Sequence, residues 1–406
     1  MIAGGGLAGL RSVQELRGRG YQGEVILIGA EPRPPYDRPP LSKKLMTGAL
    51  DDTSLDADAA ALGVEFRLAE SAVGLAGLGE SAAGGGVLRT DRGEYRFDRL
   101  AVATGAAPVR LPGTGPQRVL RSLDDALELR SVLRPGLRLA VVGAGWIGAE
   151  LATAAAAQGC QVTVLEAGPA PVAGALGAEA AATTVPWYAE AGVDLRLGQA
   201  VESVEPGGLA LPGGGWLAAD EVVTAVGVRP ATGWLDGSGV RLDNGVTVDD
   251  RLRASAAGVF AAGDCASFWS GRYGRRLRVE HWDTALHAPE VVAANMLGGD
   301  EIYDPVPYFW SEQFGRMVQY VGCHGPADRL MWRGDPGGQR WAACWLAGSE
   351  GPAAGPGRAT GRLVAVLTVN SPRDLLQGRR VIASGAQVDP GRLADPGVPV
   401  RDAVPG

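Results

Sequence analysis

Two glycine-rich segments carry the clearest chemical signal in this sequence. Residues 4–9 are GGGLAG and residues 143–148 are GAGWIG, so both have the spacing GxGxxG. The first glycine permits a tight strand-to-helix turn, the second lets the backbone approach a pyrophosphate, and the third allows close packing. The pyrophosphate then lies at the positive N-terminus of a helix. One such loop is a weak signal, but two copies predict a protein that binds two dinucleotides and moves electrons between them.

The elements around the second loop have the expected order. The apolar run at residues 139–142 predicts a buried parallel strand. Ala149–Gln158 is rich in alanine and predicts a helix that ends at Gly159. Gln161–Glu166 predicts the next strand, which ends in an acid.

Glu166 lies 18 positions after Gly148 (166 − 148), close to the spacing of an acid that binds ribose hydroxyls. A carboxylate there repels a 2′-phosphate, and residues 167–169 contain no arginine to bind one. We therefore expect NAD rather than NADP. The alternative is that Glu166 only ends a strand in solvent.

The first loop has the same neighbours, with one defect. A helix is expected over Leu10–Arg19 and a strand over Glu24–Ile28, and Glu31 follows Gly9 by 22 positions (31 − 9). Only three residues precede the glycines, whereas a strand usually has about five or six. Either this strand is frayed or the sequence starts several residues late, and we favour the late start.

Composition excludes several classes of protein. The 406 residues predict about three domains, and 46% hydrophobic with 20% charged residues is ordinary for a globular protein. No apolar run approaches the roughly 18 residues of a membrane span, and no signal peptide is apparent. A net charge of −7 argues against nucleic acid as a partner. The four cysteines have no CxxC or metal spacing, so we expect a cytoplasmic protein without a metal site.

Three further segments complete the pattern. Residues 100–105 and 222–227 are apolar runs that end in a tight turn, and residues 258–265 form a strand that ends in Gly-Asp. Together with the two loops, the chain resembles the FAD-dependent pyridine nucleotide reductases over its whole length. More narrowly, it resembles the NADH:ferredoxin reductases that serve oxygenases.

This resemblance implies an α/β fold of the glutathione-reductase type. Two Rossmann-like domains would bind FAD and NAD, and an α+β domain would follow. The implied division is an FAD domain at 1–106 and 229–304, an NAD domain at 107–228 and a C-terminal domain at 305–406. The resemblance leaves a monomer or a weak homodimer open.

The family also implies which residues hold the cofactors. Those matching FAD contacts are Gly4, Gly6, Ala8, Gly9, Glu31, Arg38, Lys43, Ala72, Thr104, Gly105, Arg121, Gly263, Asp264, His281 and Trp282. Those matching NAD contacts are Gly143, Gly145, Ile147, Gly148, Glu150, Glu166 and Gly227. Glu150 and Trp310 would flank the redox centre, and no side chain is expected to be catalytic in its own right. His281 is expected to position the flavin rather than move a proton, although the proton role stays open.

The missing cysteines indicate the electron path. Related disulfide reductases keep a CxxxxC pair after the FAD ribose acid, but residues 31–50 contain no cysteine. No dithiol relay can operate there, so electrons must leave directly from the flavin. Cys265 is interpreted as structural. A flavin that releases electrons singly suits an iron–sulfur ferredoxin, which would feed a cytochrome P450 or a Rieske oxygenase.

A basic cluster offers a docking surface for such a partner. Arg272, Arg275, Arg276 and Arg278 lie within residues 271–279. A charge run is usually a solvated face, but ferredoxins are acidic and complementary charge would steer them. Both interpretations stay open.

Several features of the second half depart from the family or extend it. Strands are expected at Met317–Gly322, Trp341–Leu346 and Leu363–Val369, with an inserted loop at Gly348–Thr360 and a family-like tail at Val388–Gly406. Members of the family often have an arginine in the loop after the acid that binds the NAD ribose. Residues 173–176 contain no arginine, which would weaken NADH binding. Pro289 is expected in the first turn of a helix.

A second function of a different class stays open. Relatives of apoptosis-inducing factor are NADH-sensing flavoproteins with a signalling role. The compact C-terminal domain, without a long insertion, favours the electron-supply enzyme.

Overall fold

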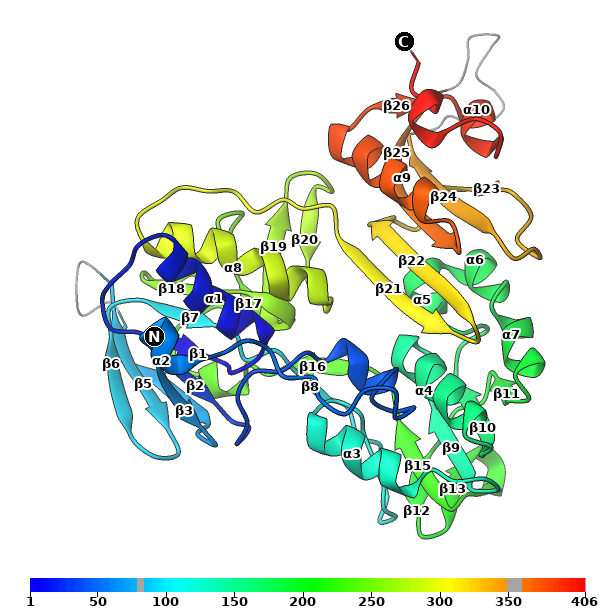
Figure 1. The fold of residues 1–406 in the computed structure, drawn as a ribbon, viewed down its shortest axis with the longest axis horizontal. Helices are drawn as coiled ribbons and strands as arrows, with labels where there is room; N and C mark the ends of the chain where they lie inside the picture. The colour runs from blue at the N-terminus through cyan, green and yellow to red at the C-terminus, as the bar shows by residue number, and fades with distance from the viewer. Residues whose placement is uncertain (79–83, 349–359, 406) are drawn as a thin grey trace. The chain divides into compact units, whose positions relative to one another are not determined.

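The computed structural model describes residues 1–78, 84–348 and 360–405, and its contacts divide the chain into two units. The first unit comprises Met1–Pro39, Asp52–Ala107 and Val228–Pro305. The second unit comprises Pro40–Asp51, Pro108–Gly227 and Val306–Gly406 (Figure 1). Most of the predicted Gly348–Thr360 loop lies outside the described residues.

The first unit is built on a parallel five-stranded sheet with the order β18-β7-β1-β2-β3. Its strands are β1 (Ile2–Ala3), β2 (Ile26–Gly29), β3 (Glu65–Leu68), β7 (Leu100–Val102) and β18 (Val259–Ala261). They are short and almost entirely apolar, as expected of strands covered on both faces. The two-residue strand β1 is fully buried at the centre, where it pairs with β2 and β7.

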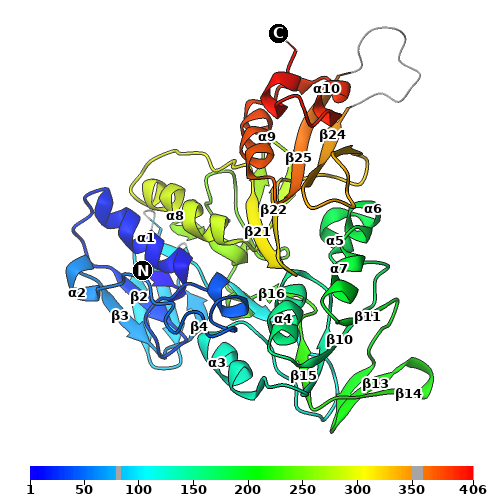
Figure 2. The same cartoon turned by 45° about the vertical axis from the view of Figure 1, so that its right-hand side comes forward.

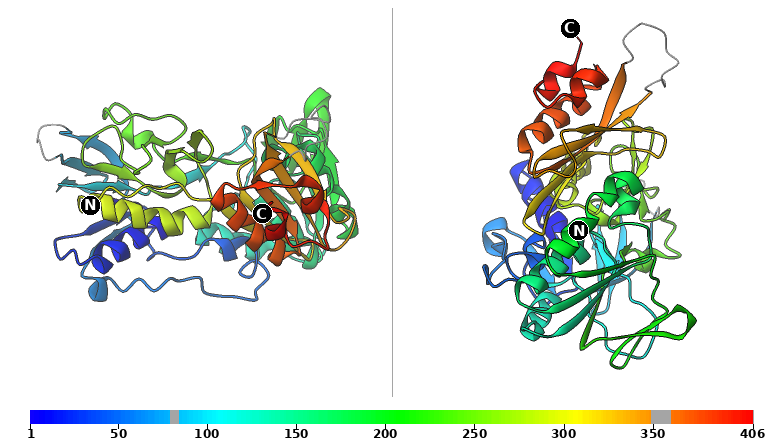
Figure 3. Two further views of the ribbon diagram at one scale, coloured as in Figure 1. Left: turned by 90° about the horizontal axis from the view of Figure 1, so that it is seen from above. Right: turned by 90° about the vertical axis from the view of Figure 1, so that its right-hand side faces the viewer.

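Two helices cover this sheet side by side, α1 (Leu7–Gly18) and α8 (Trp282–Met296), as Figure 3 shows in blue and yellow. Three small sheets or ribbons and three short helices complete the unit. They are β4 (Ala72–Ala76), β5 (Gly86–Thr90) and β6 (Glu94–Phe97); β8 (Ala106–Pro108) with β16 (Val228–Pro230); β17 (Val246–Thr247), β19 (Ala266–Ser270) and β20 (Arg275–Leu277); and α2 (Ala59–Leu62), η3 (Gly233–Leu235) and η4 (Gly263–Cys265). The short helix η1 (Pro39–Ser42) begins at the end of one segment of this unit.

The nucleotide half of the second unit repeats this plan with a four-stranded parallel sheet, β11-β10-β9-β15. The sheet comprises β9 (Arg138–Val142), β10 (Gln161–Glu166), β11 (Asp194–Leu197) and β15 (Glu221–Thr224). The other elements are α3 (Leu123–Val132), α4 (Trp146–Ala157), α5 (Ala173–Leu176), α6 (Ala178–Ala182), α7 (Val185–Glu190), β12 (Ser203–Glu205), β13 (Gly208–Leu211), η2 (Pro212–Gly214) and β14 (Gly215–Ala218). Strands β13 and β14 form the hairpin that Figure 2 shows in green.

The C-terminal half of the second unit is an antiparallel sheet covered by one long helix. The sheet has the order β21-β22-β25-β24-β23, and β26 pairs with β25. Its elements are β21 (Tyr308–Gln313), β22 (Arg316–Gly322), β23 (Arg329–Arg333), β24 (Trp341–Ala347), β25 (Gly361–Val369), α9 (Pro372–Ser384), β26 (Gln387–Val388), α10 (Pro390–Ala394) and η5 (Val400–Ala403). The predicted tail is therefore partly helical, and it packs into this core through the buried Val388, Leu393 and Val400.

Three helix predictions need correction. Helix α1 spans Leu7–Gly18 rather than Leu10–Arg19, because the Gly6 carbonyl oxygen accepts the first helical hydrogen bond from the Leu10 N–H at 3.0 Å. Helix α4 begins at Trp146 rather than Ala149, because Gly145 accepts the first helical hydrogen bond from the Ala149 N–H at 2.9 Å. Pro289 lies in the middle of α8, not in a first turn, because this helix begins seven residues earlier at Trp282. The predicted strands Gln161–Glu166, Met317–Gly322, Trp341–Leu346 and Leu363–Val369 are confirmed, the last three with one or two additional residues.

Candidate functional site

The first glycine of each loop adopts a backbone conformation that disfavours side chains. Gly4 has φ +127° and Gly143 has φ +101°. A Cβ at Gly4 would lie 2.1 Å from the Ala103 carbonyl oxygen, and one at Gly143 would lie 2.5 Å from that of Ala225. Both loops therefore turn in the same way against the end of a neighbouring strand of their own sheet, β7 for the first loop and β15 for the second.

The third glycine of each loop packs directly against the backbone of the first glycine of the same loop. A Cβ at Gly9 would lie 1.9 Å from the carbonyl oxygen of Gly4, and one at Gly148 would lie 2.0 Å from that of Gly143. Real atoms do not approach so closely, so each third glycine keeps the turn tight as well as the helix close to the strand.

The second glycine of each loop stands at a helix N-terminus, where a Cβ would meet no atom closer than 4.0 Å. Gly6 and Gly145 are the N-caps of α1 and α4, and neither helix has a side-chain cap or an acid in its first turn. A Cβ at Gly6 would meet nothing within 4 Å. The first N–H groups of a helix have no partner within the helix, so each loop offers an electropositive place that fits a pyrophosphate. Ala8 and Ile147 lie in the first turns of these helices.

Four segments proposed to contact FAD lie at one edge of the first unit's sheet. Gly4 follows β1, Glu31 follows β2, Thr104 follows β7, and Asp264 follows β18. Because these strands are parallel, their carboxyl ends meet at the same edge, which is where open α/β sheets bind ligands. Gly105 and Gly263 have positive φ in the same turns, and the Thr104 hydroxyl donates to the Ala231 carbonyl oxygen at 2.8 Å.

The acid proposed to bind the FAD ribose has two side-chain partners. The Glu31 carboxylate accepts a hydrogen bond from the Tyr36 hydroxyl at 2.5 Å and pairs with the Arg38 guanidinium at 2.6 Å. This contact places the positive charge of Arg38 beside Glu31, the acid proposed to bind the FAD ribose. Ala72, proposed to contact the adenine, opens β4 and pairs with Thr90.

The N-terminus of α8 carries the other first-unit residues of the proposed FAD site. His281 is the N-cap of this helix, and burial lowers its pKa to about 4 although nearby Asp264 opposes the shift. The ring is therefore neutral at pH 7. The Trp282 indole N–H donates to the Asp37 carboxylate at 2.7 Å, which ties the helix start to the segment after β2.

The proposed NAD ribose acid is held by backbone groups. The two carboxylate oxygens of Glu166 accept hydrogen bonds from the N–H of Ala144 at 2.8 Å and of Gly168 at 2.7 Å. The acid thus lies against the glycine loop. Gly227, proposed to contact the nucleotide, follows β15 with φ +101° and open space beside it.

A buried acid in the second unit lies at the meeting point of three segments. Glu150 on α4 is 3% exposed, and its carboxylate pairs with the Lys43 ammonium at 2.8 Å. The Ser42 hydroxyl donates to the same oxygen as Lys43, and the Ser311 hydroxyl donates to the other at 2.6 Å. Gln313 in turn donates to the Ser311 hydroxyl at 3.0 Å. These contacts join the 40–51 segment, the NAD-type helix and β21 around one charge.

The sequence predicted Lys43 and Glu150 as separate contacts and missed Ser42, Ser311 and Gln313. The only signal was that each hydroxyl adjoins a residue already singled out, Lys43 and Trp310.

Aromatic side chains lie on both faces of β21. Trp310 stacks on Tyr308 with ring centroids 6.0 Å apart, whereas the alternate residue Phe309 is buried and meets Trp146 at 4.4 Å. Arg121, proposed to contact the flavin, lies just before α3, where its N–H donates to Asp125 at 3.1 Å.

The basic cluster is largely engaged within its own unit. The Arg276 guanidinium donates to the carbonyl oxygens of Val248 and Ser267 at 2.7 and 2.8 Å. Arg278 pairs with Glu280 and is 12% exposed, and the backbone of Arg272 donates to Asp304. Arg275 and Arg276 are the exposed members.

The thiols show no redox pair. Among the described residues, no disulfide joins any of the four cysteines, Cys160, Cys265, Cys323 and Cys344. Burial raises the pKa of Cys265 to about 11 and that of Cys344 to about 12, so both are protonated at pH 7. Among the described residues, no cluster of three potential metal ligands occurs.

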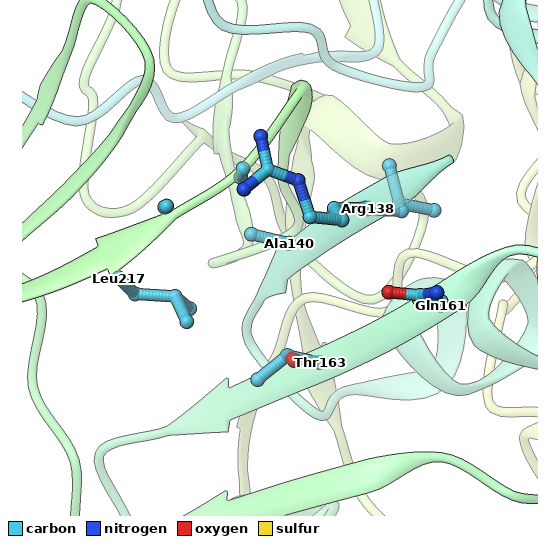
Figure 4. Close-up of a pocket in the computed structure, with 8 residues that line it drawn as sticks. Arg138, Ala140, Gln161, Thr163 and Leu217 are labelled. Carbon is cyan, nitrogen blue, oxygen red and sulfur yellow. The ribbon is translucent and has the colours of Figure 1, made fainter. Parts of the chain in front are cut away.

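A small pocket of about 210 Å³ lies in the second unit, away from the glycine loop (Figure 4). Arg138, Ala140, Gln161, Thr163 and Leu217 line it. Arg138 and Gln161 begin β9 and β10, whereas the loop follows the other end of β9. The pocket is therefore separate from the proposed nucleotide site.

None of the described helices has the length and apolarity needed to cross a membrane.

Comparison with known proteins gives full-length matches. Residues 1–288 match the pyridine nucleotide-disulphide oxidoreductase family, and residues 308–404 match the reductase C-terminal domain. The ferredoxin–NAD(+) reductase component of the anthranilate 1,2-dioxygenase system from Burkholderia cepacia is 33% identical, over 99% of this chain and 98% of the relative. Putidaredoxin reductase from Pseudomonas putida is 30% identical, over 100% and 96%.

Solved structures agree. Fdr9 superimposes with a TM-score of 0.91 at 46% identity, covering 100% of this chain and 99% of the other. A covalent complex of putidaredoxin reductase with putidaredoxin gives 0.89 at 28% identity, covering 99% and 97%. These matches, the paired glycine loops and the two nucleotide-type sheets have one explanation: the chain belongs to the pyridine nucleotide-disulphide oxidoreductase family.

Proposed function

We propose that this protein is an FAD-dependent NADH:ferredoxin reductase, which supplies electrons through an iron–sulfur ferredoxin to a P450 or Rieske oxygenase. The observation that carries the proposal is the pair of glycine loops, each at a helix N-terminus without a side-chain cap, where a Cβ at the second glycine would meet no atom closer than 4.0 Å. Full-length relatives that are ferredoxin–NAD(+) reductase components support it.

The residues of the first unit would hold FAD at the carboxyl edge of the five-stranded sheet. When bound, FAD accepts a hydride from NADH and can release the electrons one at a time. Gly6 would admit the pyrophosphate, Glu31 would bind the ribose, and the α8 N-terminus at His281 would stabilise negative charge. Neutral His281 would position the cofactor without adding charge.

The second unit would align NADH. Gly145 would admit its pyrophosphate, and Glu166 would accept hydrogen bonds from its ribose hydroxyls while repelling a 2′-phosphate. The ion pair with Lys43 would hold Glu150 in place near the nicotinamide end, with Ser42 and Ser311 fixing its two oxygens.

No thiol would take part, since residues 31–50 contain no cysteine and Cys265 and Cys344 are buried and protonated at pH 7. A cytoplasmic location suits cysteines that form no disulfide among the described residues. The four-part division at residues 106, 228 and 304 remains our proposal, as does docking of the ferredoxin at Arg275 and Arg276. The electron-supply function is favoured over a signalling role because the relatives named as ferredoxin reductases match both ends of the chain.

Reduction of cytochrome c by NADH tests this function. The purified protein should bind one FAD noncovalently and reduce cytochrome c rapidly only when a ferredoxin is added. A rate that does not depend on ferredoxin, or a protein that binds no FAD, would overturn the proposal.

A further inference from the structure

The turn between strands β21 and β22 holds a residue that its backbone conformation disfavours. Gln313 pairs with Arg316, so only Phe314 and Gly315 connect the two strands (the yellow hairpin of Figure 1). Both connecting residues have positive φ, +49° and +75°. This is the type I′ turn of a two-residue hairpin, which favours Asn-Gly because asparagine tolerates positive φ better than an aromatic residue does. A gain elsewhere must therefore offset the strain of Phe314.

The gain comes from contacts with two helices of the nucleotide half. The Phe314 ring lies against the fully buried Tyr188 of α7, with ring centroids 4.6 Å apart. The Phe314 N–H donates to the Thr153 hydroxyl on α4 at 3.0 Å. All of these residues belong to the second unit. The turn is thus seated on α4 and α7.

The first residue of β22 secures the same seat. The Arg316 guanidinium pairs with Glu190 at 2.6 Å and lies 4.9 Å from the Trp187 ring centroid, and both partners are on α7. Arg316 also donates to the Phe314 carbonyl oxygen at 3.0 Å. Its side chain is only 12% exposed, so these contacts are partly shielded from water. The turn is therefore held by its backbone, by its ring and by the charge that follows it.

Strand β21 depends on such a seat because it lies at the edge of its sheet. In the order β21-β22-β25-β24-β23 its one neighbour is β22. The strand nevertheless carries Ser311, whose buried hydroxyl donates to the Glu150 carboxylate on α4 at 2.6 Å. Glu150 and Thr153 are three residues apart, so they share one face of α4. The hairpin therefore meets this face twice, at Ser311 and at the turn.

We propose that Phe314 is a positioning residue for the reduction of FAD by NADH. Its contacts with α4 and α7 fix the position of β21 and so hold the Ser311 hydroxyl on Glu150. Glu150 is the acid proposed to lie near the nicotinamide end, where small displacements slow hydride transfer strongly. This inference rests on the proposed function and adds to it a residue that acts through Ser311 rather than on a cofactor.

Replacing the ring by the residue that the turn prefers tests this role. Phe314→Asn suits the turn conformation and removes the contact with Tyr188. Stopped-flow reduction of the full-length, FAD-loaded protein at saturating NADH should slow about tenfold. The apparent Kd for NADH should stay within about threefold, because the proposed pyrophosphate and ribose contacts are at Gly145 and Glu166. Phe314→Tyr keeps an aromatic ring and should reduce FAD within about twofold of the wild-type rate.

A double-mutant cycle shows whether Phe314 acts through Ser311. Ser311→Ala removes the hydrogen bond to Glu150 and should also slow flavin reduction about tenfold. The double variant F314N/S311A should be at most about twofold slower than the slower single variant, because both changes remove the same contact. Glu312→Ala is the matched control, since it changes an exposed side chain of the same strand and should leave the rate unchanged.

Hydrogen exchange gives a readout that does not depend on turnover. In the FAD-loaded protein without NADH, the amide N–H groups of residues 308–313 should exchange about tenfold faster in F314N than in wild type, because an unseated edge strand opens more often. Glu312→Ala should leave this exchange unchanged. A purely structural role would lower the melting temperature of F314N and leave its rate of flavin reduction unchanged. If F314N does not fold, Phe314→Leu, which keeps an apolar side chain without the ring, replaces it in every measurement.

The outcomes identify which idea fails. If NADH does not reduce the flavin of the wild type, the proposed function fails. If NADH reduces wild type and F314N at the same rate, the positioning role is wrong and the function stands. Slowing factors that multiply in F314N/S311A would show that Phe314 does not act through Ser311. A Phe314→Tyr variant as slow as F314N would show that the aromatic contact is not what holds the strand.

Discussion

The two nucleotide-type sheets share a plan and differ in what holds the acid after the second strand. In order, β3-β2-β1-β7 of the first unit corresponds to β11-β10-β9-β15 of the second, and each has a three-stranded antiparallel excursion before the last of these strands. Glu31 pairs with the cation of Arg38, whereas the partners of Glu166 within the described part of the chain are backbone N–H groups. The first acid thus has a cationic partner, whereas we propose that the second acid repels a 2′-phosphate.

The sheets also differ in how they are completed. The first gains a fifth strand, β18, and the helix α8, which together bring Asp264 and His281 to the proposed FAD site. The four-stranded sheet has no such addition. A site enclosed by extra elements suits a cofactor that stays bound, whereas a more open site suits NADH, which must leave after each turnover.

The largest expected effect tests whether the two loops are equivalent. In each loop, a Cβ added to the third glycine would collide with the carbonyl oxygen of the first glycine. The two atoms would be 1.9 Å apart at Gly9 and 2.0 Å apart at Gly148. Gly9→Ala should therefore yield protein without FAD, and Gly148→Ala should keep FAD but raise the KM for NADH about 100-fold. Overpacking of this kind costs about 1–3 kcal/mol or more. FAD absorbance and NADH–ferricyanide kinetics measure both.

Gly18→Ala is the control for that experiment. Gly18 ends α1 and a Cβ there would meet nothing within 4 Å, so the variant should keep its FAD. Full FAD occupancy in Gly9→Ala would contradict the assigned role of the loop.

The second prediction concerns the buried pair that only the second unit contains. Lys43→Met leaves the Glu150 carboxylate without its cation and should destabilise the protein by about 3–5 kcal/mol. The double variant K43M/E150Q should recover part of that loss, because no charge is then stranded. Urea unfolding gives the stabilities, and stopped-flow flavin reduction by NADH should slow about 100-fold in both variants. Stabilities that simply add would show that the two residues do not interact.

These contacts show what sequence patterns can and cannot supply. Strand Gln161–Glu166 was predictable with its bounds because its apolar alternation and its terminal acid are local features. The partners of Glu31 are also local, since Tyr36 and Arg38 follow within seven residues. The hydroxyls around Glu150 come from positions 108 and 161 residues away, and no local pattern specifies such a meeting.

Pro289 shows how a correct rule can give a wrong position. Proline is favoured in the first helical turn, but the chain after His281 is already helical from Trp282. Pro289 is buried in the interior of α8, which packs against α1.

The third prediction concerns His281 of the first unit. The nucleotide half of the second unit has no corresponding residue, because residues 108–227 contain no histidine. Burial lowers the pKa of His281 from 6.5 to about 4. Between these pH values the unfolded chain binds a proton that the folded protein does not. Stability should therefore fall as pH drops from about 6.5 to about 4, by at most about 3 kcal/mol from this residue. Urea midpoints at pH 7 and pH 5 should converge in His281→Asn; an unchanged pH dependence would rule the residue out.

The fourth prediction tests the uncompensated acid of the second unit. Wild type should prefer NADH, because a 2′-phosphate beside Glu166 costs about 1–3 kcal/mol, the size of typical specificity differences. Glu166→Ala and Glu166→Gln should both relax the preference, measured as the ratio of kcat/KM values for the two nucleotides. Equal rates of flavin reduction by NADH and NADPH in the wild type would show that Glu166 does not select.

The smallest expected effect concerns the cysteines, which neither unit uses in our proposal. Cys265 and Cys344 are fully buried with raised pKa values, and no disulfide or metal cluster involves the four thiols among the described residues. Replacing all four by alanine should leave NADH–ferricyanide turnover within about twofold, because a protonated, buried thiol is a poor nucleophile. Thermal melting and FAD content serve as controls for folding, since Cys265 and Cys344 also fill space in two cores. A variant that folds and binds FAD but no longer accepts electrons from NADH would show that a thiol lies on the electron path. The differences between the two nucleotide-type sheets would then not be enough to explain how electrons leave NADH.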